Sequence, residues 1–197
     1  MRLRATIGIS FPRRTGVIAA AAMTLLSGSI CATAQAADES VFVAHEFHKD
    51  WTNDQAYIDK LVHDADPRYE ANKRLVLDFE VALEHAQTVK DGEPGSFDEV
   101  VAKYLTADYV QYDPMFPPGR DGLLGFFKMV QQSGQKVSHP PVMMMAEGDL
   151  VTLLMMRPPL PDPADASKTY TGYRIAIWKI CGDKICAHWG PDLKEAR

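Results

Sequence analysis

The polarity pattern is clearest near the carboxyl end of the chain, where two runs rich in β-branched and aromatic residues alternate between apolar and polar positions. They span Thr169–Ile180 and Lys184–Trp189 and meet at Gly182-Asp183, a dipeptide typical of tight turns. This pattern predicts one long antiparallel hairpin. Successive side chains of a strand point to opposite faces, so we expect Arg174 and Trp178 to share a face. That face is the predicted wall of a binding pocket.

Helices are predicted upstream from apolar residues that recur at spacings of three and four. The clearest helix spans Asn72–Gln87. A second begins at Ser96 with Glu99 three residues later, which is the pattern of a capping box, and a third begins near Asp121. A shorter helix capped by Asn53 is expected ahead of them. The stripe of the clearest helix consists of Leu75, Phe79, Ala82, Leu83 and Ala86.

Three more strands complete the predicted sheet. The first is Tyr109–Tyr112, and the next two, Val142–Ala146 and Leu150–Arg157, are joined by a short turn. A proline-rich crossover, Pro158–Asp165, then leads to the long hairpin. Helices followed by antiparallel strands predict an α+β fold.

The first 36 residues have the features of a signal peptide. A basic beginning is followed by the uncharged apolar run Val17–Leu26 and by Ala34-Gln35-Ala36, the small residues that a signal peptidase requires. We therefore expect cleavage after Ala36 and a periplasmic or secreted protein. A membrane anchor is the weaker interpretation, because the apolar run is far shorter than the roughly 20 residues that cross a bilayer.

The net charge of the chain bears on which classes of binding partner the protein can have. The whole chain has a net charge of −5, and the predicted signal peptide holds four arginines and no acidic residue, so the remainder has a net charge near −9. This balance argues against nucleic acid and anionic membrane surfaces as partners. Histidines 45, 48 and 63 show no metal-binding motif such as H-E-x-x-H, and we predict no metal.

Two cysteines remain after the expected cleavage, Cys181 and Cys186, on either side of the hairpin turn. In an oxidising compartment such a pair is a candidate disulfide. A four-residue loop would place the two cysteines opposite each other, whereas a three-residue loop would stagger them, so the sequence leaves the bond open.

Several short segments resemble one family. They are Asn72-Lys73-Arg74-Leu75-Val76, Tyr109-Val110-Gln111-Tyr112-Asp113-Pro114, Gly119-Arg120-Asp121-Gly122, Ala146-Glu147-Gly148-Asp149-Leu150-Val151 and Gly182-Asp183-Lys184-Ile185-Cys186-Ala187-His188-Trp189. Together with the order of elements, they resemble the SnoaL-like polyketide cyclases of the nuclear-transport-factor-two-like superfamily, in particular the predicted aldol-condensation-type proteins. The similarity covers about residues 70–193, which gives three regions: a signal peptide (1–36), an extension with a short helix (37–69) and a SnoaL-like domain (70–193).

The resemblance implies a cone-shaped, curved antiparallel sheet packed against about three N-terminal helices around one cavity, commonly in a homodimer. In such cyclases a carboxylate of the cavity wall acts as general acid and base without a cofactor, because an apolar cavity raises its pKa. The matching candidates here are Asp113, Asp192 and His188 as catalytic residues. The candidate ligand-binding residues are Arg174, Tyr112, Trp178 and Trp189.

The chain also departs from the family pattern. Tyr112 replaces a frequent histidine, Gly190 replaces a frequent aspartate after His-Trp, and Ala176 takes the place of an acidic residue in the hairpin. Arg174 nearby would suit a ligand with a carboxylate or phosphate. His188 is equally explained as a structural histidine, and Asp113 before a proline as a turn residue.

We therefore expect an exported domain that binds a small, largely apolar molecule and catalyses isomerisation, aldol condensation or cyclisation on a carbonyl group. Two alternatives stay open at this point. The first is a non-catalytic module in which Arg174 binds an apolar anion. The second is a dimeric interaction domain whose cavity is filled by side chains.

Overall fold

Helices precede most of the strands in the computed structural model of the protein, which describes residues 42–190. The helical elements are the 3-10 turn η1 (Trp51–Asn53) and the helices α2 (Gln55–Val62), α3 (Pro67–Ala86), α4 (Phe97–Tyr104) and α5 (Gly119–Gln132). The strands are β1 (Leu105–Gln111), β2 (Pro141–Glu147), β3 (Leu150–Met156), β4 (Leu160–Pro161), β5 (Thr169–Tyr170), β6 (Tyr173–Cys181) and β7 (Lys184–Trp189). The predicted signal peptide lies outside the described residues.

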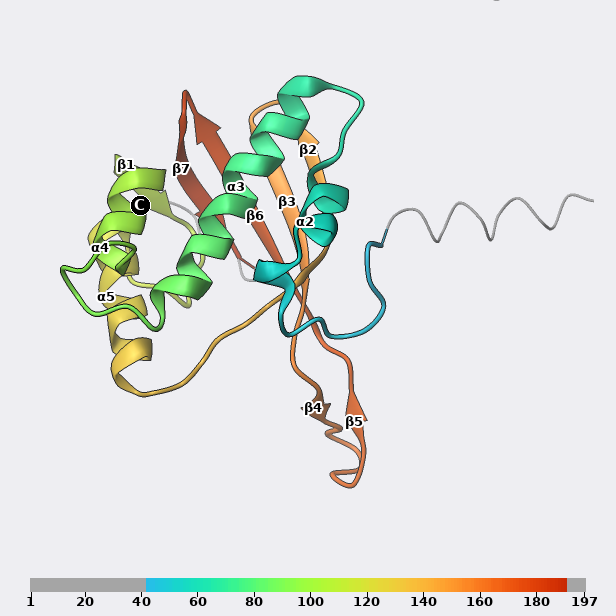
Figure 1. The fold of residues 1–197 in the computed structure, drawn as a ribbon. Coiled ribbons are helices and arrows are strands. Elements are labelled where there is room, and N and C mark those ends of the chain that lie inside the picture. Colours follow the sequence, from blue (N-terminus) through green and yellow to red (C-terminus); the bar gives the residue numbers. More distant parts are fainter. Residues whose placement is uncertain (1–41, 191–197) are drawn as a thin grey trace, which may run out of the picture.

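Five strands form one sheet in the order β1-β7-β6-β3-β2. The pairs β2–β3, β3–β6 and β6–β7 are antiparallel, as expected. β1 runs parallel to β7, so the sheet is mixed and not purely antiparallel. The predicted α+β architecture, with helices packed on one face of a curved sheet, is confirmed (Figure 1).

The long helix α3 lies across the inner face of the sheet (Figure 1). It buries an apolar side against the strands, and its Phe79 ring meets the Trp178 ring of β6 edge to face, with 5.3 Å between centroids. Aromatic pairs in this geometry add to the free energy gained by burying their area. The fully buried apolar residues of α3 are Val76, Leu77, Phe79 and Ala86.

Two helix starts differ from the sequence expectation. α3 begins at Pro67 rather than at residue 72, and the Asp66 carboxylate accepts a hydrogen bond from the backbone N–H of Arg68. Proline favours the first turn of a helix, so the Asp-Pro pair starts this helix instead of only ending the one before it. The cap of α2 is Asp54 rather than Asn53, because its carboxylate reaches the Tyr57 N–H.

The long hairpin is interrupted at its start. The predicted strand from residue 169 divides into β5 and β6 around Gly172, where a Cβ would come within 2.9 Å of a Leu160 methyl group. β4 and β5 pair with each other instead and form an arm that projects from the sheet (Figure 1). Close approach of another side chain is a frequent reason for glycine in a strand.

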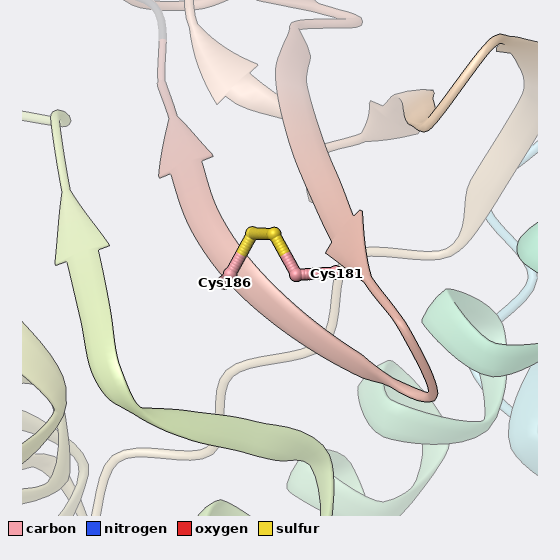
Figure 2. Close-up of a disulfide and its surroundings, with 2 residues drawn as sticks. All are labelled: Cys181 and Cys186. Atoms are coloured by element: carbon pink, nitrogen blue, oxygen red, sulfur yellow. A yellow bond between two sulfur atoms is a disulfide. The ribbon is translucent and has the colours of Figure 1, made fainter.

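Cys181 and Cys186 form a disulfide that links β6 to β7 beside the turn (Figure 2). The register shifts between Lys179 and Ile180, which brings Cys181 opposite Lys184 and leaves Cys186 one position beyond Ile185. Within residues 42–190 the structure contains no helix with the length and apolar character that a membrane crossing requires.

Candidate functional site

A cavity of about 440 Å³ lies between the inner face of the sheet and the helices. Its size is within the range of small-molecule sites. Most of its wall is apolar or aromatic, and Leu83, Phe97, Phe127, Val130, Met155 and Trp178 contribute to it. Such a wall favours an apolar ligand and penalises any charge placed inside it.

A small number of polar groups enter this wall from separate elements. Glu80 and Glu84 come from α3, Arg174 from β6 and His188 from β7. The strand residues face inward because Arg174, Ala176 and Trp178 alternate with outward residues, and because Trp178 pairs directly with His188. Arg174, Trp178 and His188 therefore line the cavity together, and the first two share a face as the sequence pattern predicted.

Asp113 is fully buried and forms an ion pair with Arg174, with 3.0 Å between Nη2 and Oδ2. Its other carboxylate oxygen accepts a hydrogen bond from the Met115 N–H, and its own N–H donates to the Gln111 side chain. The Arg174 guanidinium also lies 5.2 Å from the centroid of the Phe116 ring. This environment holds Asp113 in place as the counterion of Arg174 and offers it no open approach to a ligand. Asp192, the other candidate carboxylate, lies outside the described residues.

Gly190 provides the room for the Asp113 carboxylate. A Cβ at Gly190 would overlap the Asp113 carboxyl group. The glycine that departs from the family pattern after His-Trp is thus matched to the buried ion pair. An aspartate in its place would compete for the same volume.

His188 is a neutral imidazole with a defined tautomer. The Gln111 atom that faces His188 Nδ1 at 2.9 Å also accepts from the Asp113 N–H, so it is the amide oxygen and Nδ1 carries the proton. Burial, aided by the charge of Arg174, lowers the pKa of His188 to about 3. The ring stacks on Trp178 with 4.0 Å between centroids. His188 is therefore uncharged at neutral pH, and its bare Nε2 can only accept a hydrogen bond.

Glu80 is the cavity carboxyl group that the sequence reasoning missed. Burial in the apolar wall raises its pKa to about 7, although the nearby Arg174 charge and a hydrogen bond from Trp178 Nε1, at 3.1 Å, act in the opposite direction. A carboxyl group that titrates near neutral pH can both accept and release a proton. The available signal was the pair Glu80 and Glu84, one turn apart beside the apolar stripe of a helix.

Glu84 has a different environment from Glu80. Its carboxylate accepts hydrogen bonds from Trp51 Nε1, at 2.8 Å, and from the Ser138 hydroxyl, at 2.9 and 3.0 Å. Burial also raises the pKa of Glu84, but these two donors hold the charged form in a fixed position. Trp51 is almost fully buried and lines the cavity, so the extension before residue 70 supplies part of the wall.

Tyr112 and Trp189 do not line the cavity. Their rings stack on each other with 4.8 Å between centroids and parallel planes. Each follows an inward residue, Gln111 or His188, so strand alternation turns both to the other face. The structure therefore places these two predicted ligand-binding residues away from the cavity. Within residues 42–190 no cluster of three His, Cys, Asp or Glu side chains is arranged to hold a metal ion.

Solved structures with a similar arrangement include three from bacteria. They are TsrD from Streptomyces laurentii (18% identity, 64% of this chain and 90% of that chain covered, TM-score 0.43), a candidate polyketide cyclase from Xanthomonas campestris pv. campestris (15%, 61% and 89%, 0.44) and an NTF2-like protein from Anabaena variabilis (16%, 66% and 96%, 0.45). No protein-family model and no curated protein matches the chain.

Two of these solved structures have polyketide cyclase or NTF2-like names. At this level of identity and structural similarity, the likeness carries no activity, substrate or partner over to this chain. The function of the cavity has to follow from its own residues.

Proposed function

We propose that this is an exported protein whose cavity binds a small, largely apolar molecule with a carbonyl group, and that Glu80 moves a proton at the carbon beside that carbonyl. The observation that carries the proposal is Glu80 itself, a cavity-lining carboxyl group with a pKa raised to about 7. Proton removal next to a carbonyl needs a base matched to neutral pH, and burial provides that match.

The step requires a base and a group that stabilises the developing oxyanion. The Glu80 carboxylate would take the proton, while the C–H electron pair forms a carbon–carbon double bond and the carbonyl π pair moves to oxygen. Arg174 is near enough to influence the pKa of Glu80, and it uses Nη2 for Asp113. Its remaining N–H groups are suited to stabilise the enolate oxygen. Return of the proton to another carbon gives isomerisation, and attack of the enolate on a second carbonyl gives aldol condensation or cyclisation.

Glu80 suits the role of base better than the residues assigned from the sequence. Asp113 is fully buried and bound to Arg174 and to a backbone N–H. His188 has a pKa lowered to about 3, so it is a weak base at neutral pH. Because Asp113 already compensates the charge of Arg174, a simple anion-binding role for Arg174 has less support than the acid–base reaction.

Hydrogen exchange in deuterated water tests the reaction without knowledge of the natural substrate. We expect the wild-type protein to catalyse deuterium incorporation beside the carbonyl of some members of a panel of apolar ketones and enones, measured by mass spectrometry. Glu80→Gln keeps the shape and the acceptor for Trp178 but removes the base, so incorporation should fall by roughly a hundredfold or more. Equal rates for the wild type and Glu80→Gln would refute the assignment of Glu80.

The matched control for this experiment is Glu93→Gln, which makes the same chemical change at an exposed loop position. It should retain the wild-type rate of incorporation. A wild-type protein that exchanges none of the panel would count against the proposed reaction and leave ligand binding as the simpler function.

We also propose that the outer sheet face is the interface of a homodimer. This face is defined by Met145, Leu154, Tyr173, Ile175 and Ile177, and Leu154 pairs with Ile175 in the register of β3 and β6. Tyr173 is 49% exposed, Ile175 48% and Met145 53%, although all are large and apolar. A contiguous exposed apolar surface of this kind supports association with a second copy about a twofold axis.

Sedimentation velocity measures the association directly. We expect the wild type to sediment as a dimer and Ile175→Lys to sediment as a monomer, because a charge in the centre of an apolar interface is costly to bury. The control is Met129→Lys, which introduces the same charge at a 58% exposed position of α5 and should remain dimeric. A monomeric wild type would contradict the interface.

A further inference from the structure

Trp178, Arg174 and Arg157 follow one another on the cavity side of the paired strands β3 and β6. Trp178, which binds Glu80, lies at one end of this row. Arg174 pairs with Met155 farther along, and beyond it the Arg157 N–H donates to the Gly172 carbonyl at 2.9 Å. The pairs are two residues apart, so Arg157 faces the same side as Arg174 and lines the cavity.

The positive charge of Arg157 is not balanced by a carboxylate among the described residues. Arg174 has the buried carboxylate of Asp113, whereas Arg157 forms no ion pair with any carboxylate among residues 42–190. Arg157 is an exposed residue and also part of the cavity wall, which places it at the mouth. His139 lies near both arginines, and burial together with their charges lowers its pKa to about 4, so it is neutral at pH 7.

The aliphatic stem of the Arg157 side chain lies close to Gly172. A Cβ at Gly172 would come within 3.7 Å of the Arg157 Cδ and within 2.9 Å of a Leu160 methyl group. The absence of a side chain at this position makes room for Leu160, whereas an added Cβ would meet the aliphatic stem of Arg157 only at an ordinary contact distance. The planar guanidinium group is itself pre-organised, so it loses less conformational entropy for each hydrogen bond that it forms with a ligand.

We infer that the ligand is an elongated, largely apolar keto acid, with its carbonyl end near Glu80 and its carboxylate bound by Arg157 at the cavity mouth. The inference rests on the proposed function for the carbonyl end and adds the anionic end. A guanidinium binds a carboxylate through two parallel hydrogen bonds, which a neutral ester or amide cannot reproduce. Trp178 and Gly172 are six positions apart in the chain, so the two ends of the ligand lie less than about 20 Å apart.

Isothermal titration calorimetry with a matched pair of ligands tests this inference. The probes are 6-oxo-6-phenylhexanoate and its methyl ester, which share the ketone and differ in the charge at the far end. We expect the wild type to bind the carboxylate at least about tenfold more tightly than the ester. Arg157→Met keeps the apolar stem and should lose this preference, whereas Arg157→Lys, which keeps the charge without the two parallel donors, should retain part of it.

The control is Arg68→Met, an exposed arginine of α3 that is not part of the cavity wall, and it should keep the full preference. Equal binding of acid and ester by the wild type, or binding of neither, would overturn the keto-acid inference. A preference that survives in Arg157→Met would overturn the role of Arg157. Exchange of uncharged ketones by the wild type tests the proposed reaction separately, because it requires Glu80 and no anionic group on the ligand.

Discussion

Gly190→Ala is expected to lower the free energy of unfolding by about 3 kcal/mol or more. The added Cβ would overlap the Asp113 carboxyl group, which is fully buried and cannot move into solvent. Displacing it would separate it from Arg174 and leave a charge inside the protein without its partner. Breaking a buried ion pair in this way is among the most destabilising effects of a single substitution.

A double-mutant cycle identifies the cause of this loss. Asp113→Ala alone should also destabilise the protein, by about 3 to 5 kcal/mol, because Arg174 loses its counterion. In the Asp113→Ala background the overlap no longer exists, so adding Gly190→Ala should cost less than about 1 kcal/mol. Urea denaturation of the four proteins measures the coupling, and additive losses would mean that the two positions act independently.

Gly125→Ala is the control for the glycine substitution. Gly125 lies within α5, and a Cβ there would meet no atom within 4 Å. Alanine is a better helix former than glycine by roughly 0.5 to 1 kcal/mol, so this variant should be slightly more stable than the wild type. The two glycine substitutions are thus expected to change stability in opposite directions.

Glu80→Gln is expected to stabilise the protein above neutral pH while it removes the proposed activity. Burial raises the pKa of Glu80 from 4.5 to about 7, so the folded protein favours the protonated form. The contribution of Glu80 to the free energy of unfolding is fully present below pH 4.5 and is lost as the pH rises through about 7. The full shift corresponds to about 3 kcal/mol at pH 8. Glutamine has no charge to bury and avoids this loss.

Urea denaturation at several pH values measures this difference. Glu80→Gln and the wild type should have nearly equal stability at pH 4 and should diverge between pH 4.5 and 8. Glu93→Gln, at an exposed loop position, should follow the wild type at every pH. A difference between Glu80→Gln and the wild type that does not change with pH would show that the Glu80 pKa is not raised in the folded protein. Loss of stability at a catalytic group is a common trade-off in enzymes.

Much of the fold follows from local patterns in the sequence. The turns at Gly148 and Gly182 and the alternation of β6 define the antiparallel strands, because a period of two assigns each side chain to a face. The parallel pairing of β1 with β7 could not be predicted in this way, since it joins segments far apart in the chain. The start of α3 at Pro67 was missed because proline both ends and begins helices.

The sequence predicted only those residues of the candidate site that lie on strands with a clear alternating pattern. Arg174, Trp178 and His188 line the cavity because alternation turns them inward, and the same rule turns Trp189 outward. The partner of Arg174 lies 61 residues earlier in the chain, and no local pattern links the two. Glu80 resembles a surface residue at the edge of an amphipathic helix, and only the packing of α3 on the sheet shows that it faces a cavity.

Trp51 belongs to the segment that precedes the region of family resemblance, yet its indole lines the cavity and donates to Glu84. The cavity is therefore completed by a part of the chain outside that region. Changes in this leading segment can alter the size and shape of the cavity while the sheet and the buried ion pair stay as they are. Proteins with the same core can in this way diverge in the molecules they accept.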